Sequence, residues 1–121
     1  MALRIEDRPE EADEQPRIAD VASYVRRVAG RELTAAMVGA KDVTTVDRWA
    51  EGHAAPDRGS ARRLRDAYAV TRTLLRAEPS ETARAWLMGM NPALDDRAPA
   101  AVLAEDPAAV LRAARFLVAN G

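Results

Sequence analysis

The chain has 121 residues, which is enough for one domain or for two very small domains that share a core. It contains no cysteine, so disulfide bonds and thiolate-bound metals are excluded, and this composition fits a reducing, cytoplasmic environment. No apolar stretch approaches the roughly 20 residues that a membrane-spanning helix needs. The acidic beginning of the chain also lacks the apolar core of a secretion signal, so we expect no membrane association.

The net charge of −1 hides an uneven distribution along the chain. Residues 1–16 carry six acidic and two basic side chains, a balance of −4, and we expect this polar leader to be disordered. Residues 17–70 carry ten basic and seven acidic side chains, a balance of +3, whereas residues 71–121 carry six of each. This distribution suggests three parts with different roles.

Apolar residues recur at helical spacing through the rest of the chain, and no segment shows the alternation of a strand. The first predicted helix runs from Ile18 to Val28, and Gly30 fits its end. A second short helix is predicted over residues 32–38. A third is expected to begin after Asp42, whose carboxylate can cap it, and to end at Gly52.

Four more helices are predicted after a loop that contains Pro56. Ser60 is expected to cap the fourth, and the pair Pro79-Ser80 to open the fifth. The residues of the fifth helix that we expect to face inward are Ala83, Trp86, Leu87 and Met90. After a turn over residues 91–96, a short helix is predicted from Pro99 to Leu103, and the last helix starts at Asp106-Pro107, a cap and first-turn pair. The predicted fold is therefore all-α.

The third predicted helix carries two distinct faces in the stretch DVTTVDRWAEG, residues 42–52. Val46 and Trp49 are spaced to anchor one face in a core, together with Val43. The polar residues Thr44, Thr45 and Arg48 fall on the other side. Such a helix has one face to bury and one to offer to a partner.

No set of residues suits covalent catalysis or metal binding. His53 is the only histidine, and without cysteine it cannot form an ordinary zinc site. The serines lack a histidine partner, and the neighbouring carboxylates of Asp95 and Asp96 are not expected to converge on one reacting centre. There is no glycine-rich phosphate loop. We therefore expect a binding protein with no catalytic residues, cofactor or metal rather than an enzyme.

The second and third predicted helices have the features of a helix-turn-helix, which needs a small residue in its first helix, a tight turn and apolar anchors on its second helix. These features are supplied by Ala36, the turn GAKD at 39–42, and the anchors Val46 and Trp49. The pair resembles the Xre-type, Cro-like helix-turn-helix. The resemblance implies a DNA-binding region over residues 17–70.

In that family the outward residues of the second helix face the major groove of operator DNA. The resemblance therefore implies that Thr44, Thr45 and Arg48 contact DNA and that Lys41 lies near the phosphates. Arg48 could read a guanine or hold a phosphate. The chain departs from the pattern at Lys41 and Ala40, and the carboxylates of Asp47 and Glu51 oppose the approach of phosphates. A helical pair that keeps the shape but has lost DNA binding is the alternative.

The C-terminal part contains a second distinctive pattern: Trp86-Leu87, Asn91-Pro92-Ala93-Leu94, Arg97, Pro99 and Leu103, followed by an amphipathic helix. This pattern resembles the toxin-binding domain of the Xre/MbcA/ParS family of antitoxins. Trp86, Leu94 and Leu103 are expected to be packing anchors. The chain departs from the family where Asp95-Asp96 replaces common glycines and where Met90 replaces a common proline.

This second resemblance implies an antitoxin of a type II toxin–antitoxin system, whose usual partner is a RES-domain toxin that degrades NAD. Residues 71–121 would then bind the toxin or support a homodimer, with a toxin-facing surface that includes Asn91, Arg97, Arg112 and Arg115. By the same analogy, the N-terminal motif would bind the promoter of its own operon. Two other classes stay open: a solitary transcriptional regulator whose C-terminal part only dimerises, and a protein-interaction module with a vestigial DNA motif.

Overall fold

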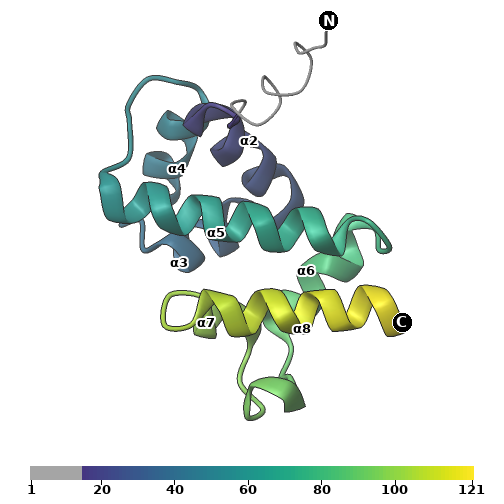
Figure 1. Cartoon of the computed structure of the whole chain (residues 1–121). Coiled ribbons are helices and arrows are strands. Elements are labelled where there is room, and N and C mark those ends of the chain that lie inside the picture. Colours follow the sequence, from purple (N-terminus) through teal and green to yellow (C-terminus); the bar gives the residue numbers. More distant parts are fainter. Residues whose placement is uncertain (1–14) are drawn as a thin grey trace, which may run out of the picture.

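The computed structural model describes residues 15–121, so the predicted disorder of the leader lies almost entirely outside the described residues. Within 15–121 the chain forms helices and no strand, which confirms the all-α prediction (Figure 1). The elements are α2 (Ile18–Ala29), α3 (Arg31–Val38), α4 (Val43–Ala50), α5 (Arg58–Leu74), α6 (Ser80–Met88), the 3-10 turn η1 (Pro92–Leu94), α7 (Pro99–Val102) and α8 (Pro107–Asn120).

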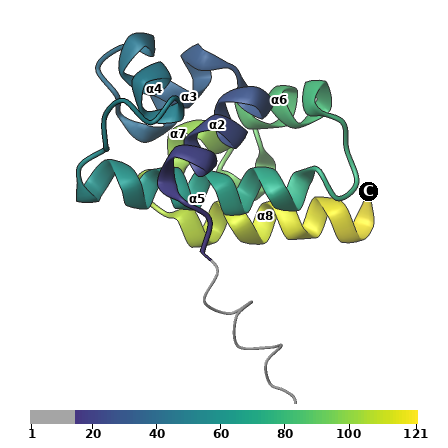
Figure 2. The same ribbon diagram turned by 90° about the horizontal axis from the view of Figure 1, so that it is seen from above.

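Helix α5 is the central element of the fold. It packs against α2 on one side and against α8 on the other. In Figure 1, α2 and α4 lie above and behind α5, and α3 emerges below it from behind; Figure 2 shows α8 running alongside α5 in the same direction. The buried side chains form one cluster that extends from Val21 in α2 to Ala114 in α8. The expected division at residue 70 therefore falls inside a helix that both parts share.

Aspartate side chains cap the starts of three helices, α4, α5 and α8. Asp42 and Asp106 each accept a hydrogen bond from the backbone N–H three residues later, as their positions in the sequence predicted. The prediction that Ser60 caps the fourth helix was wrong. The cap of α5 lies three residues earlier, because Asp57 accepts a hydrogen bond from the Ser60 N–H at 2.8 Å. Ser60 is instead buried in the first turn.

The short helices α3 and α4 are joined by a tight turn at Gly39. This residue has φ 73°, in the left-handed region that favours glycine, and the Arg63 guanidinium of α5 lies beside it. Val46 and Trp49 are buried, as predicted. Ala36 was predicted to be the small packing residue of the first helix, but it is exposed and the neighbouring Ala35 is buried instead.

The phase of α3 explains why Ala36 faces solvent. Thr34, Ala35 and Val38 face the core, and the Thr34 hydroxyl donates to the carbonyl oxygen of Gly30 at 2.7 Å. This inward row fixes the rotation of the helix, and Ala36 is left on the outer side. The small residue that the predicted arrangement needs is therefore present one position earlier than expected.

In the C-terminal part, Ala83 and Leu87 are buried as predicted, and Leu94 and Leu103 are in the core. The prediction for Met90 was wrong, since 80% of its surface is exposed. α6 ends at Met88, and the extended Gly89 directs the chain away before Met90 can face inward. Trp86 is only partly buried, so it serves as an anchor on one side and as surface on the other.

Candidate functional site

The outward face of α4 presents part of the predicted DNA-binding set. Thr44 and Arg48 are exposed one turn apart, and the exposed Lys41 precedes the helix. Thr45 is turned differently: both its backbone N–H and its hydroxyl donate to Oδ1 of Asp42, each at 2.8 Å. The structure therefore brings Lys41, Thr44 and Arg48 to one surface and uses Thr45 mainly to close the cap.

The carboxylate of Asp47 lies against two arginines from other helices. Its Oδ1 accepts from Nη1 of Arg26 on α2 at 2.9 Å, and its Oδ2 accepts from Nη2 of Arg31 on α3 at 2.6 Å. Nε of Arg31 also reaches both oxygens at 3.1 and 3.2 Å. Glu51 is 3.8 Å from Arg26 and completes the group. Sequence reasoning missed these partners, because they lie 16 and 21 residues away from Asp47.

These contacts make stability depend on pH in the acid range. Hydrogen bonds from Arg31 lower the pKa of Asp47, those from Arg97 lower the pKa of Glu105, and the capping N–H groups lower the pKa of Asp42 and Asp57. A lowered pKa in the folded state contributes stability that is fully present above the unfolded value near 4 and is lost as the pH falls through the folded value. Burial raises the pKa of Asp66, so the contribution of this group to stability changes with pH in the opposite direction.

We therefore expect the melting temperature to fall as the pH is lowered from 7 to about 3, because the four lowered groups outnumber the one raised group. Thermal melts followed by circular dichroism would measure this. The variant Asp47→Asn should show a weaker pH dependence than the natural chain, and equal slopes for both proteins would contradict the assignment of this effect to Asp47.

Two of the predicted toxin contacts hold the turn after α6 together. The Asn91 side chain accepts a hydrogen bond from the Ala93 N–H at 2.9 Å, and its backbone N–H donates to the Arg97 carbonyl at 3.2 Å. The Arg97 guanidinium binds both carboxylate oxygens of Glu105, at 3.0 and 2.7 Å. Asp95 and Asp96 follow η1 in the left-handed region, with φ 59° and 62°. Asn91 and Arg97 therefore have structural partners within the chain.

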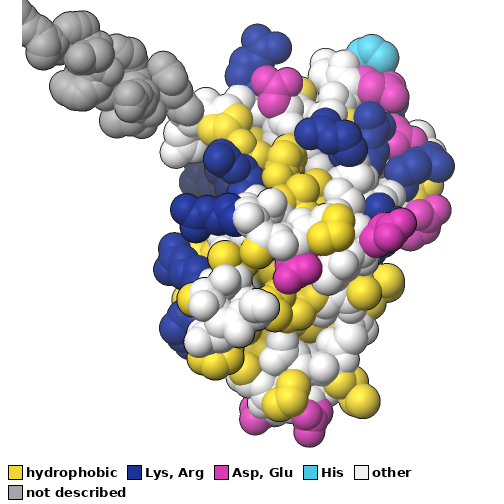
Figure 3. All heavy atoms as spheres, turned by 90° about the vertical axis from the view of Figure 1, so that its right-hand side faces the viewer, with side chains coloured by type: hydrophobic (Ala, Val, Ile, Leu, Met, Phe, Trp, Pro, Cys, Tyr) yellow, Lys and Arg dark blue, Asp and Glu magenta, His cyan; other side chains and the backbone are white. Residues whose placement is uncertain are grey.

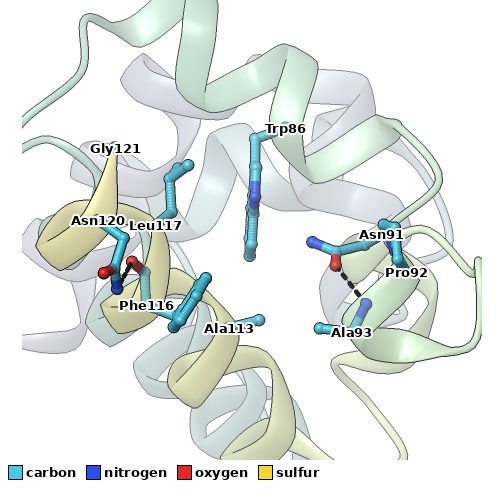
Figure 4. A pocket seen from close by; sticks show the side chains of 9 residues that line it. All are labelled: Trp86, Asn91, Pro92, Ala93, Ala113, Phe116, Leu117, Asn120 and Gly121. Carbon is cyan, nitrogen blue, oxygen red and sulfur yellow. Dashed lines mark hydrogen bonds between the residues drawn. The ribbon is translucent and has the colours of Figure 1, made fainter.

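An apolar groove lies between α6, η1 and α8, with a volume of about 340 Å³. We call it the α6–α8 groove. Its lining residues are Trp86, Asn91, Pro92, Ala93, Ala113, Phe116, Leu117, Asn120 and Gly121. In Figure 4 the ring of Trp86 stands between α8 and the turn, and the Asn91 amide nitrogen points toward it. Phe116, at the rim, is 69% exposed.

This groove was hard to predict from the sequence. Phe116 lies off the apolar stripe of the last helix, and the groove forms only when α8 packs beside the turn at Asn91. An aromatic side chain outside the apolar stripe was the available signal. Seen from the side on which the C-terminus lies, the lower part of the surface shows hydrophobic side chains with acidic ones at its lowest edge, whereas basic side chains gather along the left edge and upper part (Figure 3).

The predicted contacts Arg112 and Arg115 are both exposed on α8, and neither lines the groove. Arg112 lies one turn before Phe116 and therefore beside the rim. Arg115 lies farther round the helix, on the flank that faces away from Ala113 and Leu117. The structure thus places one of the two arginines next to an apolar surface and the other apart from it.

The described residues, 15–121, hold no group of three or more side chains able to bind a metal ion. His53 is exposed, with Nδ1 at 3.7 Å from a carboxylate oxygen of Glu51. No helix among the same residues is long and apolar enough to cross a membrane. Comparisons with protein-family models, with curated proteins and with solved structures give no match to this chain. Arguments about function therefore rest on the surfaces described above.

Proposed function

We propose that the chain is the antitoxin of a type II toxin–antitoxin system and neutralises a RES-domain, NAD-degrading toxin by binding it. The observation that carries this proposal is the α6–α8 groove. It is built from the same segment that resembles the toxin-binding domain, and Trp86 is common to both. An open apolar groove with an exposed aromatic residue at its rim has the composition of a protein–protein contact centre.

The test is co-expression with a RES-domain enzyme encoded beside this chain. Cells that express the enzyme alone should lose NAD and stop growing, and cells that also express the chain should keep both NAD and growth. The two proteins should co-elute as a complex in size-exclusion chromatography. Depletion of NAD that is unchanged by the chain would refute the proposal for that pair.

We further propose that α3, its turn and α4 form a Cro-like helix-turn-helix that binds the promoter of the same operon. Support comes from the buried anchors Val46 and Trp49, the positive φ of Gly39 in the turn, and the exposed Thr44 and Arg48 on one face of α4. Pairing of Asp47 with two arginines also removes much of the negative charge that the sequence placed on this helix.

Changing Arg48 to Ala is expected to weaken promoter binding by about 1–3 kcal/mol if the guanidinium contacts a base edge with two hydrogen bonds. Fluorescence anisotropy with a labelled promoter fragment would measure this loss. Arg76→Ala is the matched control, because it removes the same charge from an exposed position at the end of α5. An equal loss in both variants would show that Arg48 acts only through net charge.

A solitary regulator that dimerises through its C-terminal part is the second candidate. The same groove favours it, since a surface that carries both a cavity and an exposed Phe116 can pair with a copy of itself. Sedimentation of the purified chain would report a homodimer. A homodimer whose groove is fully covered, with no toxin gene nearby, would favour this candidate over the antitoxin.

A further inference from the structure

Asp47 occupies an unusual place for an acidic residue on a helix proposed to read DNA. It lies in the middle of α4, between Val46 in the core and Arg48 on the outer face. Its side chain is 21% exposed and contacts the guanidinium groups of Arg26 and Arg31. Asp47 thus connects α4 to both of the helices that precede it in the chain.

The group formed by Arg26, Arg31, Asp47 and Glu51 carries two positive and two negative charges and is therefore neutral. Among the described residues, Lys41 and Arg48 form no ion pair, and neither does Arg63, whose guanidinium lies beside Gly39 in the turn before α4. The local excess of positive charge is therefore smaller than the number of arginines around α4 suggests.

Arg31 is the first residue of α3 and remains 48% exposed. When a helix-turn-helix docks, its first helix crosses the phosphate backbone, so exposed cations on that helix are close to phosphates. A guanidinium held by a carboxylate through three contacts cannot direct the same donors at a phosphate without breaking them.

We propose that Asp47 restrains DNA binding by withholding Arg31, and in part Arg26, from the phosphate backbone. This inference rests on the proposed DNA binding of the α3–α4 pair. The restraint lowers affinity for DNA of any sequence, because phosphate contacts carry no sequence information. Recognition then depends more on the residues that reach base edges, Thr44 and Arg48. Asp47 acts here as a specificity-determining residue that need not touch a base.

The test is Asp47→Asn, with binding to a short random-sequence DNA duplex measured over a range of salt concentrations. Asparagine keeps the shape of the side chain but releases Arg31, whereas Arg26 retains Glu51 at 3.8 Å. Each added phosphate contact steepens the dependence of log affinity on log salt by about 0.9. We therefore expect a slope steeper by about 1–2 and tighter binding at low salt than in the natural chain.

Two control variants separate this effect from a general change of charge or stability. Glu105→Gln also replaces a carboxylate by an amide and releases an arginine, Arg97, from a salt bridge, but this pair is far along the chain from α4. The salt dependence of DNA binding by this variant should match that of the natural chain. The triple variant Arg26→Gln, Arg31→Gln, Asp47→Asn lacks all three charges, and its slope should be no steeper than the natural one. Circular dichroism would establish that each variant is folded.

The outcomes separate this inference from the proposed function. If the natural chain binds the promoter and folded Asp47→Asn shows an unchanged slope on random DNA, the restraint is refuted and promoter recognition stands. If the natural chain binds no DNA but Asp47→Asn gains salt-sensitive binding, the restraint stands and promoter recognition by the natural chain falls. Absence of binding by both proteins at low salt would refute both.

Discussion

Replacing Leu87 by alanine is expected to destabilise the helices at both ends of the chain together. Leu87 is fully buried in α6, which packs against α2 and α7. Truncation of a buried leucine removes its burial energy and leaves a cavity, at a cost of about 2–5 kcal/mol. Because a single core cluster connects α2 to α8, the loss should appear in one transition rather than in two.

Chemical denaturation followed by two signals would measure this. Far-ultraviolet circular dichroism reports all helices, and tryptophan fluorescence reports the surroundings of Trp49 in α4 and Trp86 in α6. Both signals should shift by the same amount in the Leu87 variant. Met88→Ala is the control, because its side chain is 57% exposed on the same helix and should cost far less. Separate midpoints for the two signals would contradict a shared core.

Changing Phe116 to Asp is expected to weaken binding of the proposed toxin strongly and to leave the fold intact. Phe116 is 69% exposed at the rim of the α6–α8 groove, so its replacement removes little core packing. At a contact centre, a buried aromatic residue is commonly worth about 2 kcal/mol or more, and a carboxylate would also have to be desolvated there. The expected loss of affinity is at least about thirty-fold.

Charge reversal at Arg112 and Arg115 tests the alternative that α8 binds through its basic residues. Arg112 lies beside the rim of the groove and Arg115 lies on another flank of α8. We therefore expect the double variant to slow association more than it speeds dissociation. Its loss of affinity should be smaller than that of Phe116→Asp. Surface plasmon resonance separates the two rates, and melting temperatures control for folding. A larger loss from the arginine variant would place the contact centre outside the groove.

The helices and several of their ends could be predicted because they depend on local patterns. The caps Asp42 and Asp106 could be predicted because a capping carboxylate accepts from a backbone N–H only three residues later in the chain. Ser60 was misassigned because Asp57 competes for the same helix start, and both are good capping residues. The error at Ala36 arose from choosing between two adjacent alanines, where only the rotation of α3 against its neighbours decides.

The surfaces were less predictable, because their partners come from distant parts of the chain. The exposure of Thr44 and Arg48 followed from the periodicity of one helix. The pairing of Asp47 with Arg26 and Arg31 depends on how three helices cross, and the groove depends on where α8 meets the turn at Asn91. Single-helix patterns contain no information on such crossings. Such patterns indicate which side chains face away from the core, but not which residues of other helices those side chains contact.

The shared helix α5 also limits how such a chain can diversify. Its buried face supplies Leu64 to Leu74 to the single core, and it packs against helices from both ends of the sequence. A recombination event within residues 58–74 would combine part of the buried face of α5 from one parent with packing helices from the other. The resulting mismatch in core packing would affect the helices at both ends of the chain. Inheritance therefore favours the chain as one indivisible unit. New combinations of binding properties would arise by point changes at exposed positions, such as Thr44 or Phe116, which leave that inner face untouched.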